Sequence, residues 1–275
     1  MHVPLGPLAG PIGRDLQRDA QRDATEVLVG RARPGAATVT EADLVGLPGP
    51  AQRYLRWMGV VGRPRERSFL VRFTGRFRRG RSWMPCEAWQ FNAGDPITRL
   101  FHMRIDVARV VPMVGRDSYA AGRGAMRGKV LGLVTVADGS GPEFDLGELV
   151  TYLNDAALLA PSMLLTDAVR WGEVDEGSFD LTLTDEGHTV TARAFVDHDG
   201  ALVDFATEDR WCDLPGGLVR ARWTTPIDGW REVEGRPWPT GARAVWHLPD
   251  GPLPYVEGTF VAGSIARDVW PGAWT

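Results

Sequence analysis

The side chains best suited to acid–base chemistry lie in one short segment of alternating polar and apolar residues. Within residues 100–107, LFHMRIDV, the polar residues His102, Arg104 and Asp106 take every second position. Because successive side chains of a strand point to opposite faces, these three share one face. A carboxylate beside an imidazole fixes its tautomer and keeps its pKa near neutrality, which suits general acid or base catalysis. The alternative is a solvated strand face, since any half-buried strand shows polar alternation.

A second candidate cluster, Arg116-Asp117-Ser118-Tyr119, opens a glycine-rich segment. Asp117 could serve there as a base, and Tyr119 as an acid or hydrogen-bond donor. A structural ion pair between Arg116 and Asp117 is the competing interpretation. The predicted catalytic residues are therefore His102, Asp106, Asp117 and Tyr119.

Tryptophan is abundant, with 11 in a chain of 275 residues, and several of these residues fall on expected strands. Aromatic side chains on a curved sheet form either a core or an apolar ligand cavity. On the cavity hypothesis, the predicted substrate-binding residues are Trp89, Arg104, Met126, Tyr152, Trp223, Trp246 and Tyr255.

Other chemical motifs are weak or absent. Residues 122–129, GRGAMRGK, resemble a phosphate-binding loop, but Arg123 replaces its first glycine and Val130 its serine or threonine. The segment also reads as a strand and not as a strand-to-helix turn. Neither Ser140 nor Ser264 lies in a nucleophile elbow, and no zinc-ligand spacing occurs. The sequence therefore predicts no cofactor and no metal.

Composition limits the partners and the compartment. A net charge of −4 provides no positive field for nucleic acid, and no apolar run reaches the roughly 18 residues of a membrane span. No basic start followed by an apolar stretch marks export, and two cysteines, Cys86 and Cys212, are too few for a disulfide framework. We expect a cytoplasmic protein. Whether these cysteines pair, and the oligomeric state, stay open.

The chain divides near residue 45. Residues 14–24, RDLQRDAQRDA, repeat their charges every four positions with only a thin apolar stripe, which is typical of a solvated, fraying helix. We predict a disordered or weakly helical tail over residues 1–45 and a single β-rich domain over residues 46–270. Within the domain, helical periodicity appears at residues 51–58 and 143–159.

Most of the domain alternates with a period of two, which is typical of strands. The expected strands are residues 68–77, 84–91, 99–107, a glycine-rich pair within 118–136, 179–183, 190–196, 203–205, 218–224, 242–248 and 255–266. The glycines of the pair suggest bulges or strong curvature. We predict a mainly β (α+β) fold, a large curled antiparallel sheet or half-barrel wrapped around one or two helices.

The order of motifs over residues 46–267 resembles a family of uncharacterised bacterial proteins that is common in actinobacteria. The motifs are Leu47-Pro48, Tyr54-Leu55-Arg56-Trp57, Trp83-Met84-Pro85, Gly115-Arg116-Asp117 with Tyr119, Gly122, Gly124, Met126 and Lys129, Gly147-Glu148-Leu149, Tyr152-Leu153, and Trp246-His247-Leu248-Pro249-Asp250-Gly251 with Tyr255. The resemblance implies a curled sheet around a helix, similar to the periplasmic lipoprotein carriers, and implies no activity. The chain departs from the family pattern at His102, Phe144 and Trp211.

Three functions are compatible with these observations. The first is a cofactor-independent cyclase, isomerase or lyase of specialised metabolism that holds an apolar small molecule in the curved sheet. Its motivation is a polar row facing the interior. The second is a non-catalytic carrier of a lipophilic ligand, which needs the cavity but no aligned acid and base. The third, a module that recruits a partner through the tail, rests only on the tail's low complexity.

Overall fold

The computed structural model describes residues 37–107, 111–131 and 134–268. Its helical elements are η1 (Glu41–Leu44), α2 (Gly49–Trp57), α3 (Pro142–Leu159) and η2 (Pro161–Leu164). Its strands are β1 (Ser68–Arg79), β2 (Ser82–Gly94), β3 (Ile97–Val107), β4 (Val111–Ala120), β5 (Arg123–Val130), β6 (Val134–Ser140), β7 (Val169–Asp175), β8 (Ser178–Asp185), β9 (His188–Val196), β10 (Leu202–Thr207), β11 (Trp211–Leu214), β12 (Gly217–Arg220), β13 (Arg222–Thr224), β14 (Ile227–Val233), β15 (Arg236–Leu248) and β16 (Gly251–Arg267).

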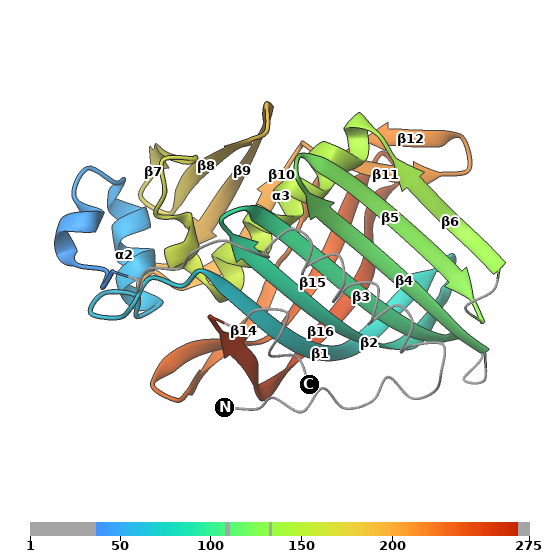
Figure 1. Cartoon of the computed structure of the whole chain (residues 1–275), viewed down its shortest axis with the longest axis horizontal. Helices are drawn as coiled ribbons and strands as arrows, with labels where there is room; N and C mark the ends of the chain where they lie inside the picture. Colours follow the sequence, from blue (N-terminus) through green and yellow to red (C-terminus); the bar gives the residue numbers. More distant parts are fainter. Residues whose placement is uncertain (1–36, 108–110, 132–133, 269–275) are drawn as a thin grey trace.

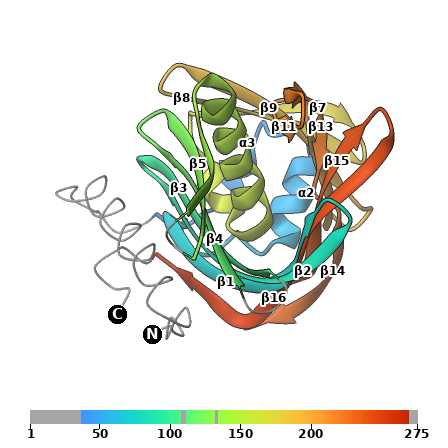
Figure 2. The same cartoon turned by 90° about the vertical axis from the view of Figure 1, so that its right-hand side faces the viewer.

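Fourteen of these strands form one antiparallel sheet that curls around α3 (Figure 1). The strand order is β6-β5-β4-β3-β2-β1-β16-β15-β13-β10-β9-β8-β7, with β14 paired to β15 and a separate β11–β12 hairpin. Strands β6 and β7 end the order without pairing to each other, so the sheet is not closed into a barrel. Figure 2 shows α3 and α2 inside the curl. The predicted fold class is confirmed.

Helix α3 is the central element of the interior. Pro142 occupies its first turn, and Glu143 and Asp145 place favourable negative charge at its N-terminus. From Gly147 to Leu159 every residue is buried, because the sheet surrounds the helix on more than one side. The predicted helix at 143–159 is confirmed. Its all-round burial means that any charged side chain on it is enclosed by protein.

The interior is packed more tightly on one side than on the other. Around α2, α3 and β7–β10, side chains such as Phe179 and Phe205 are fully buried, with 0% exposure. On the inner face of β1–β3, Phe101 and Met103 each keep 9% exposure, and Phe73 keeps 8%. Solvent therefore reaches the apolar inner face of β1–β3 at several points.

Several boundaries differ from the sequence-based expectation. Val39 and Leu44 are buried and Thr38 bridges to Pro64, so the packed part of the chain begins before residue 45. The predicted strand pair at 118–136 is part of three strands, β4, β5 and β6, and strands β7 and β14 were not predicted at all. The predicted helix at residues 14–24 lies outside the described residues.

Candidate functional site

The two faces of β3 are identified by a contact with the central helix. Arg99 Nη1 lies 2.6 Å from Glu148 Oε2 on α3, so the odd-numbered side chains of β3 face the interior. By alternation, His102, Arg104 and Asp106 point to the convex side of the sheet. The expected inward orientation of this polar row is therefore wrong. The apolar positions of the strand, together with Arg99, take the inner face instead.

The convex row has its own local contacts. Arg104 Nε donates to Asp106 Oδ1 over 2.9 Å, and Trp89 lies across the strand pair from His102 with ring centroids 6.3 Å apart. Four predicted site residues, His102, Asp106, Trp89 and Arg104, therefore lie on the side of the sheet away from α3. We do not propose them for catalysis or for binding in the interior.

A buried ion cluster joins β3 to α3. Arg99 donates from Nη1 to Glu148 and from Nε to Asp155 Oδ2, the latter over 2.7 Å. Arg99 and Glu148 are each only 4% exposed. Burial raises the pKa of Glu148 to about 7, against the opposing charge of Arg99. Burial likewise raises the pKa of Asp155, again opposed by Arg99. One guanidinium thus holds two carboxyl groups inside the protein.

Asp117 lies next to this cluster on the inner face of β4. It is directly opposite Phe101 on β3 and keeps partial exposure. Burial raises the pKa of Asp117, while the charges of Arg99 and Arg210 oppose the rise. The Asp117 charge in turn adds to the raised pKa of Glu148. Asp117 is therefore the member of the group that solvent reaches.

Arg210 faces Asp117 and Glu148 from the other arm of the curled sheet. Its guanidinium lies over the Trp223 ring at 4.4 Å and within 5.5 Å of the Trp246 ring. Arg210 Nη1 and Trp223 Nε1 both donate to Tyr255 Oη, at 3.4 and 3.1 Å. Trp246 stacks on Tyr255 with ring centroids 6.0 Å apart. We call Trp223, Trp246 and Tyr255 the aromatic wall.

Together, five ionisable residues form what we call the inner charged site, namely Arg99, Asp117, Glu148, Asp155 and Arg210. Its two cations and three carboxyl groups come from β3, β4, α3 and the segment before β11. With an excess of one carboxyl group in a poorly solvated interior, the site favours uptake of a proton or of a hydrogen-bond donor.

The sequence-predicted residues divide between this site and other positions. Trp223, Trp246, Tyr255 and Asp117 are brought together, and Met126 is directly opposite Asp117 on β5. Tyr119 is fully buried and donates to Asp185 over 2.8 Å, and burial raises its pKa. Tyr152 is buried on α3, where burial also raises its pKa. Both tyrosines therefore retain their protons under ordinary conditions.

Four members of the inner charged site were not predicted, namely Arg99, Glu148, Asp155 and Arg210. Glu148 was explained as favourable charge near a helix N-terminus. Its spacing to Asp155 was the available signal, because residues seven apart lie on one face of a helix. Two carboxyl groups on one face of an otherwise apolar helix indicate a buried cationic partner. No comparable signal marks Arg210, which lies in a connecting segment.

Other features of the described ranges bear on the remaining expectations. Cys86 and Cys212 are both buried and unpaired with each other. Among residues 37–107, 111–131 and 134–268, no group of three or more His, Cys, Asp or Glu is placed to hold a metal ion. Within the same ranges, no helix has the length and apolar character that a membrane crossing requires.

Glu148 predicts a measurable pH dependence of stability. Its pKa rises from an ordinary 4.5 to about 7 on folding, so the folded chain keeps a proton that the unfolded chain loses. Stability from this group is therefore complete below about pH 4.5 and decreases as the pH rises toward 7, by at most about 3 kcal/mol. Urea unfolding of Glu148→Gln between pH 5 and 8 is expected to show a flatter profile than wild type. Identical slopes would contradict the assignment.

The fold and the site define a class of protein in which a curled antiparallel sheet encloses a helix and a charged, aromatic-lined interior. The chain belongs to the Family of unknown function (DUF6544), whose model matches residues 37–258. The expected family resemblance is thereby confirmed. No curated protein matches the chain.

Solved structures with a related outline were also found. A LolA superfamily protein from Nitrosomonas europaea is 12% identical with a TM-score of 0.41, covering 87% of this chain and 98% of its own. A DUF1329 family protein from Desulfovibrio piger is 13% identical with a TM-score of 0.42, covering 80% and 92%. A β-barrel-like DUF1849 protein from Brucella abortus is 10% identical with a TM-score of 0.27, covering 74% and 99%.

Proposed function

We propose that this chain is a carrier that binds a small molecule with an apolar body and one polar group on the inner face of its sheet. The observation that carries the proposal is the position of two half-buried, oppositely charged side chains, Asp117 and Arg210, beside the aromatic wall. A site of this kind combines apolar contact area with a few polar groups that orient the ligand.

The apolar part of the ligand would contact the inner face of β1–β3. Phe73, Phe101 and Met103 line this face and keep small exposed fractions that the core around α3 lacks. Phe73 lies within 5.9 Å of Phe101 and 5.5 Å of Phe260, measured between ring centroids. This continuous aromatic surface offers apolar area to a ligand without burying further charge.

The polar part of the ligand would meet Asp117 and Arg210. Arg99, Glu148 and Asp155 satisfy one another, whereas Asp117 interacts with its cationic neighbours through charge and keeps contact with solvent. Arg210 is held in place by stacking on Trp223, which leaves most of its donors directed away from the protein contacts described above. A hydroxyl, amide or amine group of the ligand could bond to both residues.

Fluorescence titration tests the proposal. Amphipathic compounds of graded chain length are expected to give a saturable change in tryptophan emission, because Trp223 and Trp246 lie at the site. The change should become smaller in Trp246→Phe and remain in Trp211→Phe, a control whose indole lies on the β11–β12 hairpin. A library-wide absence of saturable binding would contradict the proposal.

A second candidate function is a cofactor-independent cyclase, isomerase or lyase that acts by acid–base catalysis. The observation that favours it is the pKa of Glu148, raised by burial to about 7, beside the accessible carboxyl group of Asp117. Two interacting carboxyl groups with separated pKa values can act as acid and base. Turnover of a bound ligand that disappears in Asp117→Asn, while ligand binding persists, would select the enzyme over the carrier. Unchanged turnover in that variant would exclude Asp117 as the base.

A further inference from the structure

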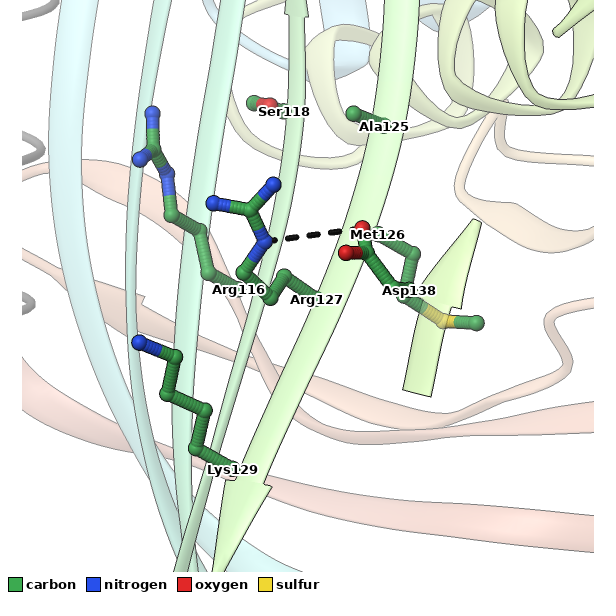
Figure 3. A pocket seen from close by; sticks show the side chains of 7 residues that line it. All are labelled: Arg116, Ser118, Ala125, Met126, Arg127, Lys129 and Asp138. Atoms are coloured by element: carbon green, nitrogen blue, oxygen red, sulfur yellow. Dashed lines mark ion pairs between the residues drawn. The ribbon is translucent and has the colours of Figure 1, made fainter. Parts of the chain in front are cut away.

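The convex side of β4, β5 and β6 carries a small pocket that is separate from the inner charged site. The pocket has a volume of about 200 Å³ and is lined by Arg116, Ser118, Ala125, Met126, Arg127, Lys129 and Asp138. Arg116, Arg127 and Lys129 extend to the same side of their strands (Figure 3). Three cations therefore converge on one part of the outer surface.

The lining carries more positive than negative charge. Arg116 and Arg127 lie directly opposite each other on β4 and β5, and like charges in such pairs are destabilising. Asp138, opposite Arg127 on β6, is the one carboxylate in the lining, and its Oδ1 lies 3.5 Å from Arg127 Nε. A bound dianion would offset the two charges that remain.

The donor types and the size of the pocket indicate which anion fits. Guanidinium groups bind phosphate oxygens in pairs, lysine adds a point charge, and the Ser118 hydroxyl can donate one hydrogen bond. A volume of about 200 Å³ is smaller than the roughly 300–1,000 Å³ of sites that enclose whole ligands. The pocket therefore suits one group of a larger molecule. A phosphomonoester carries about two negative charges at neutral pH, which matches the excess charge.

We propose that this pocket binds the phosphate of a phosphomonoester. The residues belong to the segment whose glycines resemble a phosphate-binding loop, but the structure places residues 123–130 on strand β5 and not before a helix. Recognition would therefore use side chains on the convex face and no backbone cradle. The proposal is independent of ligand binding in the interior.

The single lysine of the chain provides a direct test. Because Lys129 is unique, reductive ¹³C-methylation yields one lysine signal in NMR spectra and preserves its charge. Titration with methyl phosphate is expected to shift this signal saturably, with tighter binding at pH 8 than at pH 5, where the phosphate loses its second charge. A shift that is linear, or that chloride reproduces at equal ionic strength, would overturn the proposal.

Variants of the pocket give opposite expected effects. Arg127→Gln should weaken methyl phosphate binding about tenfold, because one charge-assisted pair is lost. Asp138→Asn should strengthen binding several-fold, because a competing carboxylate is removed. Arg193→Gln, which alters an exposed ion pair on β9, serves as the control and should bind as wild type does. Equal affinity in all three variants would overturn the proposal, and the gain expected for Asp138→Asn cannot arise from misfolding.

The phosphomonoester could belong to a soluble metabolite or to a lipid headgroup. Sedimentation with phosphatidylcholine vesicles that contain phosphatidic acid, compared with vesicles that contain phosphatidylglycerol, separates the two sources. Binding that requires phosphatidic acid and is lost in Arg127→Gln assigns the lipid, and saturable methyl phosphate binding without sedimentation assigns a soluble ligand. Equal binding to both anionic lipids that persists in Arg127→Gln would contradict a specific site.

Discussion

Replacing Arg99 by leucine is expected to lower the free energy of unfolding by about 3–5 kcal/mol at pH 8. The substitution removes the one cation that donates hydrogen bonds to both Glu148 and Asp155, and it leaves these carboxyl groups enclosed by protein. Chemical denaturation monitored by circular dichroism measures the loss. Because protonation neutralises the stranded carboxyl groups, the loss should become smaller at pH 5.

A matched control separates burial from ion pairing in general. Arg193 pairs with Asp180 at 2.8 Å, but their side chains are 44% and 32% exposed. Arg193→Leu is expected to cost less than about 1 kcal/mol, since exposed ion pairs contribute little. The triple variant Arg99→Leu, Glu148→Gln, Asp155→Asn should recover part of the loss. Equal destabilisation by Arg99→Leu and Arg193→Leu would contradict the buried cluster.

Substituting Gly124 by alanine is expected to destabilise the fold by about 3 kcal/mol. A Cβ at this position would lie 2.1 Å from the carbonyl oxygen of Phe144 and 2.7 Å from the backbone nitrogen of Asp145. Both atoms belong to the backbone at the start of α3, so no side-chain rotation can relieve the contact. Strand β5 and helix α3 would have to separate, which would also disturb the Gly124 hydrogen bond to Asp145, now 2.6 Å.

Gly147 provides the control for Gly124 on the same helix. A Cβ at Gly147 meets no atom within 4 Å outside the helix's own backbone. Because alanine is a better helix former than glycine, Gly147→Ala should stabilise the protein by about 0.5–1 kcal/mol. Thermal unfolding of the two variants should therefore shift in opposite directions. A neutral Gly124→Ala would mean that β5 and α3 are not in close contact.

The sheet and its central helix could be predicted because their patterns are local. The period-two alternation of residues 68–77 and 190–196 and the apolar helix ended by Pro161 specify these elements without tertiary information. Strand β14 escaped prediction because the run that contains Gly229, Trp230 and Arg231 shows no clean alternation. Its pairing with β15 depends on tertiary contacts and not on its own pattern.

The site was harder to predict than the fold, because alternation identifies two faces without saying which face is inside. In β3 the row with His102 looked chemical, yet the face with Phe101 and Met103 turned inward and carried Arg99 with it. The convex row is itself buried, with His102 only 4% exposed, so burial alone would not have settled the choice. Contacts distant in sequence, such as Arg210 beside Asp117, come only from the curl of the sheet.

Native mass spectrometry of protein purified from its own host tests the central claim most directly. Mild ionisation should reveal a bound small molecule, and denaturing extraction should release it. We predict the same adduct on wild type and on Arg220→Gln, a control in which the changed side chain lies over Trp211 outside the interior. We predict its loss from Arg210→Gln, which removes the cation beside the aromatic wall. An adduct of equal occupancy on folded Arg210→Gln, or a wild-type protein that is empty in every preparation, would contradict the account.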